Sequence, residues 1–178
     1  MQEVKRALRK ELIARRKSMD KQKKSIADEN IFLQIKPLIL QADSVLTYVS
    51  TDIEVDTRRV LEFCFENAIP VAVPVSGDSE LEFYEIKSMD DLSEGRFGIQ
   101  EPVNRQHTFE AGKKTLCIVP ALCADGSGLR LGYGRGYYDR FLSRFEGKSA
   151  VVCYSDFRME VPSEAHDKAA DLTIFDKN

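Results

Sequence analysis

The sequence of 178 residues contains few cysteines and histidines, and their spacing argues against two common kinds of site. Its four cysteines include no C-x-x-C pair, and its two histidines, His107 and His166, lie far apart. Zinc sites and disulfide frameworks need closer cysteine spacing, and a catalytic triad needs a histidine beside a nucleophile. The sequence therefore gives no support for zinc-dependent or triad-dependent hydrolysis. All four cysteines, Cys64, Cys117, Cys123 and Cys153, are predicted to be buried thiols, and Cys117 and Cys153 lie within apolar runs.

Long hydrophobic runs are also missing from the sequence. No apolar stretch reaches the ~18 residues of a membrane span, and the basic N-terminus is not followed by the apolar core of a signal peptide. The contents of 43% hydrophobic and 31% charged residues are typical of a globular protein. A domain of this length buries about 70% of the surface that its unfolded chain exposes. We therefore expect one cytoplasmic domain over residues 1–178, with no membrane partner.

The positive charge is concentrated at the N-terminus. Residues 1–24 have a local balance of +7, which leaves −10 for the rest of a chain whose net charge is −3. A basic segment of this kind is typical of a solvated helix face or of a nucleic-acid contact. The acidic remainder would repel a polyanion beyond this one segment, so we expect no nucleic-acid partner.

Residues 4–19 are rich in strong helix formers and predict a basic N-terminal helix. Val4, Leu8 and Leu12 recur at four-residue spacing, which predicts a narrow apolar stripe. Lys5 and Arg9 are one turn apart beside that stripe and can therefore reach inward toward a ligand.

The rest of the chain alternates strand and helix patterns, beginning with a second helix that Ser25 is predicted to cap. The residues between the predicted elements, including 90–98, 103–114 and 121–136, are predicted loops. This order predicts an α/β fold: a single three-layer domain with a mainly parallel sheet flanked by helices, Rossmann-like. Further helices are predicted at 25–40, 58–67 and from 137 to about 145, and strands at 44–50, 69–75, 81–86, 115–119, 149–154 and 171–175.

Residues 121–142 follow the predicted strand at 115–119 and complete a strand-loop-helix unit, in which Gly132, Gly134 and Gly136 occupy alternate positions. Removing every second Cβ lets backbone N–H groups close around an anion, and the following helix directs its positive end to the same place. Arg130 and Arg135 add guanidinium donors suited to phosphate, and Asp139 suggests a divalent cation between carboxylate and phosphate. The simpler interpretation is a turn with solvated charges, since a G-x-G-x-G loop alone is weakly specific.

The complete string R-L-G-Y-G-R-G-Y-Y-D-R-F, residues 130–141, resembles the signature of the 5-formyltetrahydrofolate cyclo-ligase family. Further segments resemble the family in the same order: K-R-A-L-R (5–9), E-V-D-T (54–57), F-G-I-Q-E-P (97–102) and V-P-S-E-A-H-D (161–167). Ala121 and Ala124 depart from the family's usual glycine and phenylalanine, and Arg135 stands where many members have lysine.

The resemblance implies an ATP- and Mg²⁺-dependent enzyme that converts 5-formyltetrahydrofolate to 5,10-methenyltetrahydrofolate and acts as a monomer. An ATP-independent sugar-phosphate isomerase or acyl-transferase of similar architecture is the alternative. By resemblance, Asp139 and Asp167 hold Mg²⁺, and Phe97 either stacks on the folate or packs in the core. The roles of Tyr137 and Tyr138 stay open between substrate contact and packing. The implied ATP-binding residues are Lys5, Arg9, Arg130, Gly132, Gly134, Arg135, Gly136, Tyr137 and Tyr138. The implied folate-binding residues are Arg9, Val49, Glu54, Phe97, Tyr133, Arg135 and Tyr137.

Overall fold

The computed structural model describes residues 1–95 and 98–177. Its helices are α1 (Gln2–Lys17), α2 (Lys21–Ile39), α3 (Arg58–Glu66) and α4 (Tyr137–Leu142). Short 3-10 helices occupy Met89–Asp91 and Ser155–Phe157. The strands are β1 (Ser44–Leu46), β2 (Val71–Ser76), β3 (Leu81–Ile86), β4 (Leu92–Glu94), β5 (Gln100–Pro102), β6 (Thr115–Pro120), β7 (Cys123–Ala124), β8 (Arg130–Leu131), β9 (Lys148–Cys153) and β10 (Leu172–Phe175).

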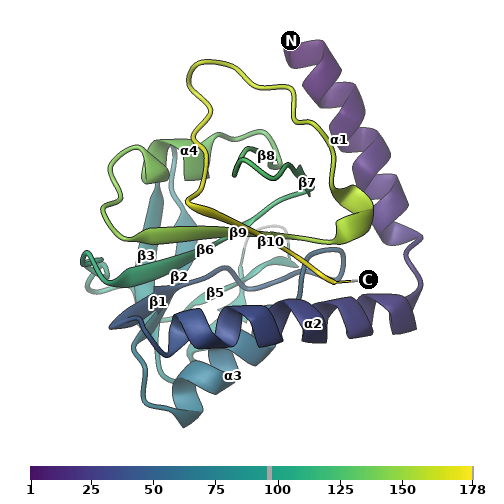
Figure 1. Ribbon diagram of the computed structural model, residues 1–178. Coiled ribbons are helices and arrows are strands. Elements are labelled where there is room, and N and C mark those ends of the chain that lie inside the picture. The colour runs from purple at the N-terminus through teal and green to yellow at the C-terminus, as the bar shows by residue number, and fades with distance from the viewer. Residues whose placement is uncertain (96–97, 178) are drawn as a thin grey trace.

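The main sheet has the strand order β10-β9-β6-β1-β2-β3. All neighbouring pairs in it are parallel except β2 and β3, which run antiparallel. The α2 and α3 helices lie together below the sheet, α4 and the β7–β8 hairpin lie above it, and α1 runs along one side (Figure 1). The prediction of an α/β fold with a mainly parallel sheet is confirmed.

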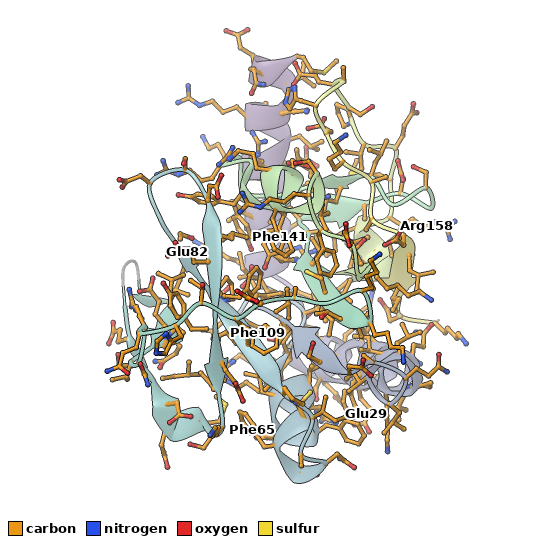
Figure 2. All side chains as sticks on the ribbon, turned by 90° about the vertical axis from the view of Figure 1, so that its left-hand side faces the viewer. Glu29, Phe65, Glu82, Phe109, Phe141 and Arg158 are labelled. Carbon is orange, nitrogen blue, oxygen red and sulfur yellow. The ribbon has the colours of Figure 1, made fainter. Side chains whose placement is uncertain are left out.

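The sheet core forms because its central strands are apolar on both faces, as expected for strands covered by helices on each side. Leu116, Ile118 and Val151 are almost completely buried. Phe141 projects from α4 into the interior (Figure 2), where its ring centroid lies 4.9 Å from that of Phe83 on β3. Truncating such a buried ring to alanine costs about 3–5 kcal/mol. The sheet and the layers on it thus form a rigid support for the loops at its edge.

The direction in which successive strands are added to the sheet reverses between β1 and β6. From β1 the chain continues through α3 to β2 on one side, whereas β6 pairs on the other side of β1. In open α/β sheets, ligands bind beyond the carboxyl ends of the strands at such a reversal. The fold therefore directs attention to the loops that follow β1, β6 and β9, which are neighbouring parallel strands.

The buried face of α1 differs from the predicted stripe. Val4 is 57% exposed, whereas Lys5, Leu12 and Arg16 are buried. The prediction of an apolar face through Val4 was therefore wrong. The face turned inward is largely polar because α1 packs on loop carbonyls and carboxylates instead of on the apolar sheet.

Several predicted boundaries also change. The α2 helix begins at Lys21 because the Asp20 carboxylate accepts a hydrogen bond from the Lys23 N–H at 2.8 Å, so Asp20 and not Ser25 is the cap. The β1 strand ends at Leu46, since Thr57 Oγ1 contacts the Tyr48 carbonyl at 2.5 Å, where a continuing strand would pair with a neighbour. The last helix ends at Leu142.

Two predicted loops contain short strands that pair in antiparallel fashion. The predicted loop at 90–98 contains β4, which pairs with β5, and the predicted loop at 121–136 contains β7 and β8. Strands of two or three residues are too short to show alternating hydrophobicity, which is why the sequence pattern missed them. The segment at 103–114 has no regular element, as predicted.

Candidate active site

Three loops converge at the carboxyl ends of β1, β6 and β9. They span residues 47–57, 121–136 and 154–171, and each follows a parallel strand of the main sheet. The α1 helix contacts all three, through the carbonyls of Ile53, Leu122 and Asp156. Segments at opposite ends of the sequence therefore meet at one edge of the sheet.

The glycine loop lies directly against Arg9 of α1. Arg9 Nε donates a hydrogen bond to the Gly132 carbonyl at 2.9 Å. A Cβ at Gly134 would lie 3.0 Å from Arg9 Cζ, and the φ of +98° at Gly134 also favours glycine. Gly136 has a φ of +67° and precedes the first residue of α4. The loop therefore needs glycine at 134 and 136 for two reasons, backbone conformation and close approach of a guanidinium.

Arg130 links the glycine loop to the loop after β9. Its side chain is 3% exposed and donates to Asp139 Oδ1 at 3.1 Å and to the Lys168 carbonyl at 2.6 Å. Asp139 Oδ1 also accepts from the Lys168 N–H at 3.1 Å. Asp139 therefore contacts Lys168, the residue that follows Asp167 in the sequence. The two carboxylates predicted for the metal site lie in one region of the structure.

Lys5 forms a nearly buried ion pair with the loop after β9. Its Nζ lies 2.6 Å from Asp167 Oδ2 and 3.1 Å from Glu164 Oε2. Burial by itself would lower the pKa of Lys5, but hydrogen bonds and charges from Asp167 and Glu164 outweigh burial and raise it. Burial likewise opposes ionisation of Asp167, yet hydrogen bonds from Lys5 and from the Glu164 N–H lower the pKa of that carboxyl. Both groups are thus held in their charged forms.

The predicted folate loop presents Glu54 toward the glycine loop. Glu54 Oε2 accepts from the N–H and from Oγ1 of Thr51, each at 2.8 Å. Burial, the charge of Glu54 and a hydrogen bond with its carboxylate raise the pKa of Tyr133. Tyr133 remains 44% exposed, while Val49 is 6% exposed. Tyr133 therefore offers part of its ring to solvent.

The two tyrosines that begin α4 have different environments. Tyr137 Oη donates to the Gly77 carbonyl at 2.9 Å, and its ring lies 5.3 Å from the Arg140 guanidinium carbon. Tyr138 Oη is buried and has no hydrogen-bond partner among the residues that the structure describes. The Arg135 side chain is exposed, and Phe97 lies outside the described residues. Tyr137 thus contacts the β2–β3 turn, while Tyr138 points inward.

Sequence reasoning missed four buried side chains that surround the predicted folate loop: Arg16, Asp28, Tyr48 and Tyr154. Arg16 stacks on the Tyr154 ring, with its Cζ 5.2 Å from the ring centroid. One signal was available, since residues 5, 9, 12 and 16 follow helical spacing and place Arg16 on the face of Lys5 and Arg9. Asp28 and the tyrosines carried no comparable pattern.

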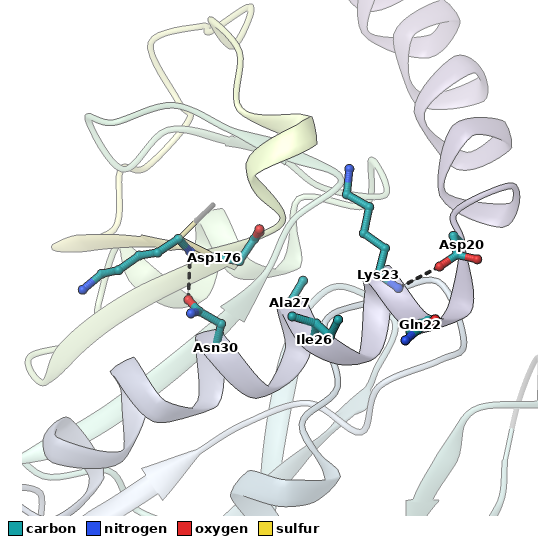
Figure 3. A pocket seen from close by; sticks show the side chains of 8 residues that line it. Asp20, Gln22, Lys23, Ile26, Ala27, Asn30 and Asp176 are labelled. Carbon is teal, nitrogen blue, oxygen red and sulfur yellow. Dashed lines mark hydrogen bonds between the residues drawn. The ribbon is translucent and has the colours of Figure 1, made fainter.

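Two hollows in the described surface contain none of the predicted site residues. One has a volume of about 390 Å³ and lies between α2 and the chain after β10, lined by Lys23, Ile26, Asn30 and Asp176 among others (Figure 3). The other, of about 200 Å³, is lined by Glu85, Lys87, Asn104 and His107. We place the candidate site at the three loops, where the charged side chains converge.

None of the helices within residues 1–95 and 98–177 has the length and apolar character needed to span a membrane.

The sequence of the chain is similar to those of curated 5-formyltetrahydrofolate cyclo-ligases. It is 29% identical over 172 residues to the 5-formyltetrahydrofolate cyclo-ligase of Mycolicibacterium smegmatis, covering 91% of this chain and 88% of that protein. It is 31% identical over 104 residues to the "Probable 5-formyltetrahydrofolate cyclo-ligase" of Caenorhabditis elegans. That match covers 54% of this chain and spans only half, 50%, of the nematode protein.

Solved structures give the same picture of the fold. The NMR structure of Aquifex aeolicus 5,10-methenyltetrahydrofolate synthetase matches with a TM-score of 0.85 at 28% identity, covering 98% of this chain and 91% of the other. A 5,10-methenyltetrahydrofolate synthetase from Mycoplasma pneumoniae matches with a TM-score of 0.77 at 24% identity, covering 97% and 99%, which shows likeness of fold. A profile of the 5-formyltetrahydrofolate cyclo-ligase family matches residues 1–175, and the chain therefore belongs to that family.

Proposed function

We propose that this protein is an ATP-dependent ligase that converts 5-formyltetrahydrofolate to 5,10-methenyltetrahydrofolate, with release of ADP and phosphate. The observation that carries the proposal is the convergence of Lys5, Arg9 and Arg130 with the glycine loop and with Asp139. Cations, backbone donors and a carboxylate gathered in one place suit a nucleotide triphosphate. Membership of the cyclo-ligase family supports the folate as the second substrate.

In the proposed reaction, the γ-phosphoryl group of ATP is transferred to the formyl oxygen, which turns a poor electrophile into an iminium phosphate. The N10 nitrogen attacks the formyl carbon and loses its proton, and the bond from that carbon to oxygen breaks as phosphate leaves with the oxygen. Phosphoryl transfer of this kind depends on positioning and charge neutralisation, so it needs no side-chain nucleophile. Lys5, Arg9 and Arg130 would hold the phosphates, and Arg135, an exposed residue of the glycine loop, would approach them from solvent.

The carboxylates fit a magnesium ion that arrives with the nucleotide. Mg²⁺ is usually held by one or two carboxylates together with substrate phosphates and water. In the described part of the chain, no three His, Cys, Asp or Glu side chains are grouped to hold a metal ion by themselves. Asp139 and Asp167 would supply the two carboxylates, and the ion would neutralise phosphate charge when bound. Lys5 and Arg130, which pair with them here, would then face phosphate oxygens.

The folate would occupy the side of the site bordered by Glu54, Val49 and Tyr133. Glu54 supplies a carboxylate that Thr51 holds in place, and carboxylates accept hydrogen bonds from ring N–H and amino groups of the kind a pterin carries. Val49 supplies apolar surface, and the partly exposed ring of Tyr133 is available for packing on a flat ring system. Tyr138 Oη, buried without a partner among the described residues, would face the junction of the two substrates.

The test is an absorbance measurement at the methenyl-folate band. Purified protein is mixed with 5-formyltetrahydrofolate, Mg²⁺ and ATP, and a matched reaction omits ATP. Growth of the band only when ATP is present is the expected result. Growth in both reactions would contradict the ATP requirement. If the protein binds nucleotide but the absorbance band does not grow, the proposed phosphate site would stand and the proposed folate substrate would be contradicted.

A further inference from the structure

Four side chains form hydrogen bonds to successive backbone groups of residues 53–56, the segment that contains Glu54. Arg16 Nη1 on α1 donates to the Ile53 carbonyl at 2.9 Å. Tyr154 Oη, directly after β9, lies 2.8 Å from the Glu54 carbonyl and donates to it. Side chains from two distant parts of the sequence therefore hold two successive peptide groups of a loop, where strands or helices usually hold them.

Two more side chains hold the next two residues of the same loop. Tyr48 Oη, just after β1, donates to the Val55 carbonyl at 3.0 Å. Asp28 Oδ1 on α2 accepts from the Asp56 N–H at 3.0 Å. Asp28 Oδ1 also lies 2.7 Å from Tyr154 Oη, whose single proton is shared between this carboxylate and the Glu54 carbonyl. The contacts on either side of Glu54 therefore form one connected network.

All four of these side chains are buried. Tyr154 is 1% exposed, Arg16 is 3% exposed, and Asp28 and Tyr48 are each 6% exposed. Buried polar groups of this kind cannot exchange their partners for water, so each bond fixes the loop without competition from solvent. Lys24 balances the charge of Asp28, with its Nζ 2.8 Å from Asp28 Oδ2. The loop is thus ordered before any ligand arrives.

Arg16 also fixes the distance between two loops of the site. Its Nη2 donates to the Ala121 carbonyl at 2.7 Å and to the Leu122 carbonyl at 2.9 Å, both at the start of the segment that leads to the glycine loop. The same guanidinium therefore ties the loop after β1 to the loop after β6. A planar group with five donors in fixed directions suits this bridging better than a lysine would.

From this network we infer that Arg16, Asp28, Tyr48 and Tyr154 are positioning residues for Glu54. They do not touch the substrate; they hold the loop so that the Glu54 carboxylate is already placed when the folate binds. A loop held in this way loses little conformational freedom on binding, which increases affinity. The role in folate binding rests on the proposed function, whereas the anchoring of the loop does not.

The test uses variants that each delete a single oxygen atom. Tyr48→Phe and Tyr154→Phe remove the hydroxyls that hold Val55 and Glu54, and Tyr84→Phe is the matched control. Tyr84 is 7% exposed, and its hydroxyl donates to Glu82 Oε2 at 2.8 Å on the same strand, away from the loop. The first measurement is hydrogen exchange of the backbone amides of residues 54–57 in the protein without ligand.

We expect exchange of these amides to become about tenfold faster in Tyr48→Phe and Tyr154→Phe, because each lost bond makes local opening easier. Exchange in Tyr84→Phe is expected to match the wild-type protein. The second measurement is steady-state kinetics, in which the KM for 5-formyltetrahydrofolate should rise about tenfold while kcat and the KM for ATP stay within about twofold. A variant that was merely destabilised would not separate the two KM values.

Unchanged amide exchange in both variants would overturn the anchoring. Faster exchange with an unchanged KM for folate would overturn the positioning role and leave the contacts purely structural. Faster exchange in the two variants, together with a wild-type protein that does not convert 5-formyltetrahydrofolate, would instead overturn the proposed function and support the anchoring. If Tyr154→Phe does not fold, Tyr48→Phe decides the test, since the one hydrogen bond that the Tyr48 hydroxyl makes among the described residues is to the Val55 carbonyl.

Discussion

The Nζ atom of Lys5 lies 2.6 Å from Oδ2 of Asp167, a residue 162 positions further along the chain. The family resemblance assigns Lys5 to phosphate and Asp167 to magnesium, and here the two neutralise each other. A nucleotide with its metal ion would therefore exchange one set of ion pairs for another. Because Lys5 already pairs with Asp167 and Glu164, the site keeps its shape without leaving an unpaired carboxylate in a nearly buried position.

Replacing Lys5 with methionine is expected to lower the free energy of unfolding by on the order of 3 kcal/mol, because two carboxylates would be left beside each other without a cation. Urea unfolding at pH 7 measures the change. Lys10→Met, on the exposed side of α1, is the control and should have little effect. Adding Asp167→Asn to Lys5→Met should restore part of the loss, and strictly additive losses would contradict the pairing.

Arg9→Ala is expected to raise the KM for ATP and to reduce kcat together. The loss in kcat/KM should correspond to about 2–4 kcal/mol, since a charged donor aimed at the transferring phosphoryl group acts mostly in the transition state. Arg6→Ala is the matched control, because Arg6 is an exposed arginine on the same helix. Unchanged kinetics in Arg9→Ala would remove Arg9 from the site.

Alanine substitutions at two glycines of the same loop should reduce the stability of the protein by different amounts. Gly134→Ala places a Cβ 3.0 Å from Arg9 Cζ at a φ of +98°, so we expect a loss of stability of about 1–3 kcal/mol. Gly132→Ala meets no atom within 4 Å and should change stability by less than about 1 kcal/mol. Thermal unfolding of both variants is the measurement. Equal losses in the two proteins would show that close approach to Arg9 does not matter.

The four cysteines should be unreactive in the folded protein. Burial raises the pKa of Cys64, Cys117 and Cys153 to about 12, and that of Cys123 to about 11, from 9.0. At pH 8 the thiolate fraction is then on the order of one in a thousand or lower, so an aromatic disulfide reagent should label the thiols only after urea is added. Rapid labelling without urea would contradict this.

The raised pKa values of the same thiols lead us to expect that the protein loses stability at high pH. The unfolded chain releases its thiol protons near pH 9, while the folded protein retains them until about pH 11–12. The folded state therefore binds more protons in this window, and the cysteines' contribution to stability falls as the pH rises from 9 to 12. Urea unfolding across this range should show a shallower decline in a Cys64→Ala variant than in the wild-type protein.

Much of the fold was predictable because it is encoded in local patterns. Apolar runs such as Thr115–Pro120 mark buried parallel strands, and helical spacing marks the helices between them. The mainly parallel sheet followed from that alternation. Short strands such as Cys123–Ala124 were missed because two residues carry no periodicity, and the cap of α2 was misplaced because both Asp20 and Ser25 are acceptable N-caps.

The sequence by itself determined which residue types were available to the site: a glycine loop, two cations one helical turn apart, and carboxylates after the strands. Only the tertiary structure decided their partners. The strand order β9-β6-β1 brings the loops of Asp167, Arg130 and Glu54 to one edge, and no local pattern records that order. The pairing of Lys5 with Asp167, and the anchoring of Glu54 by Asp28 and Tyr154, are contacts between distant segments, which periodicity cannot encode because it reports only which face of an element is buried.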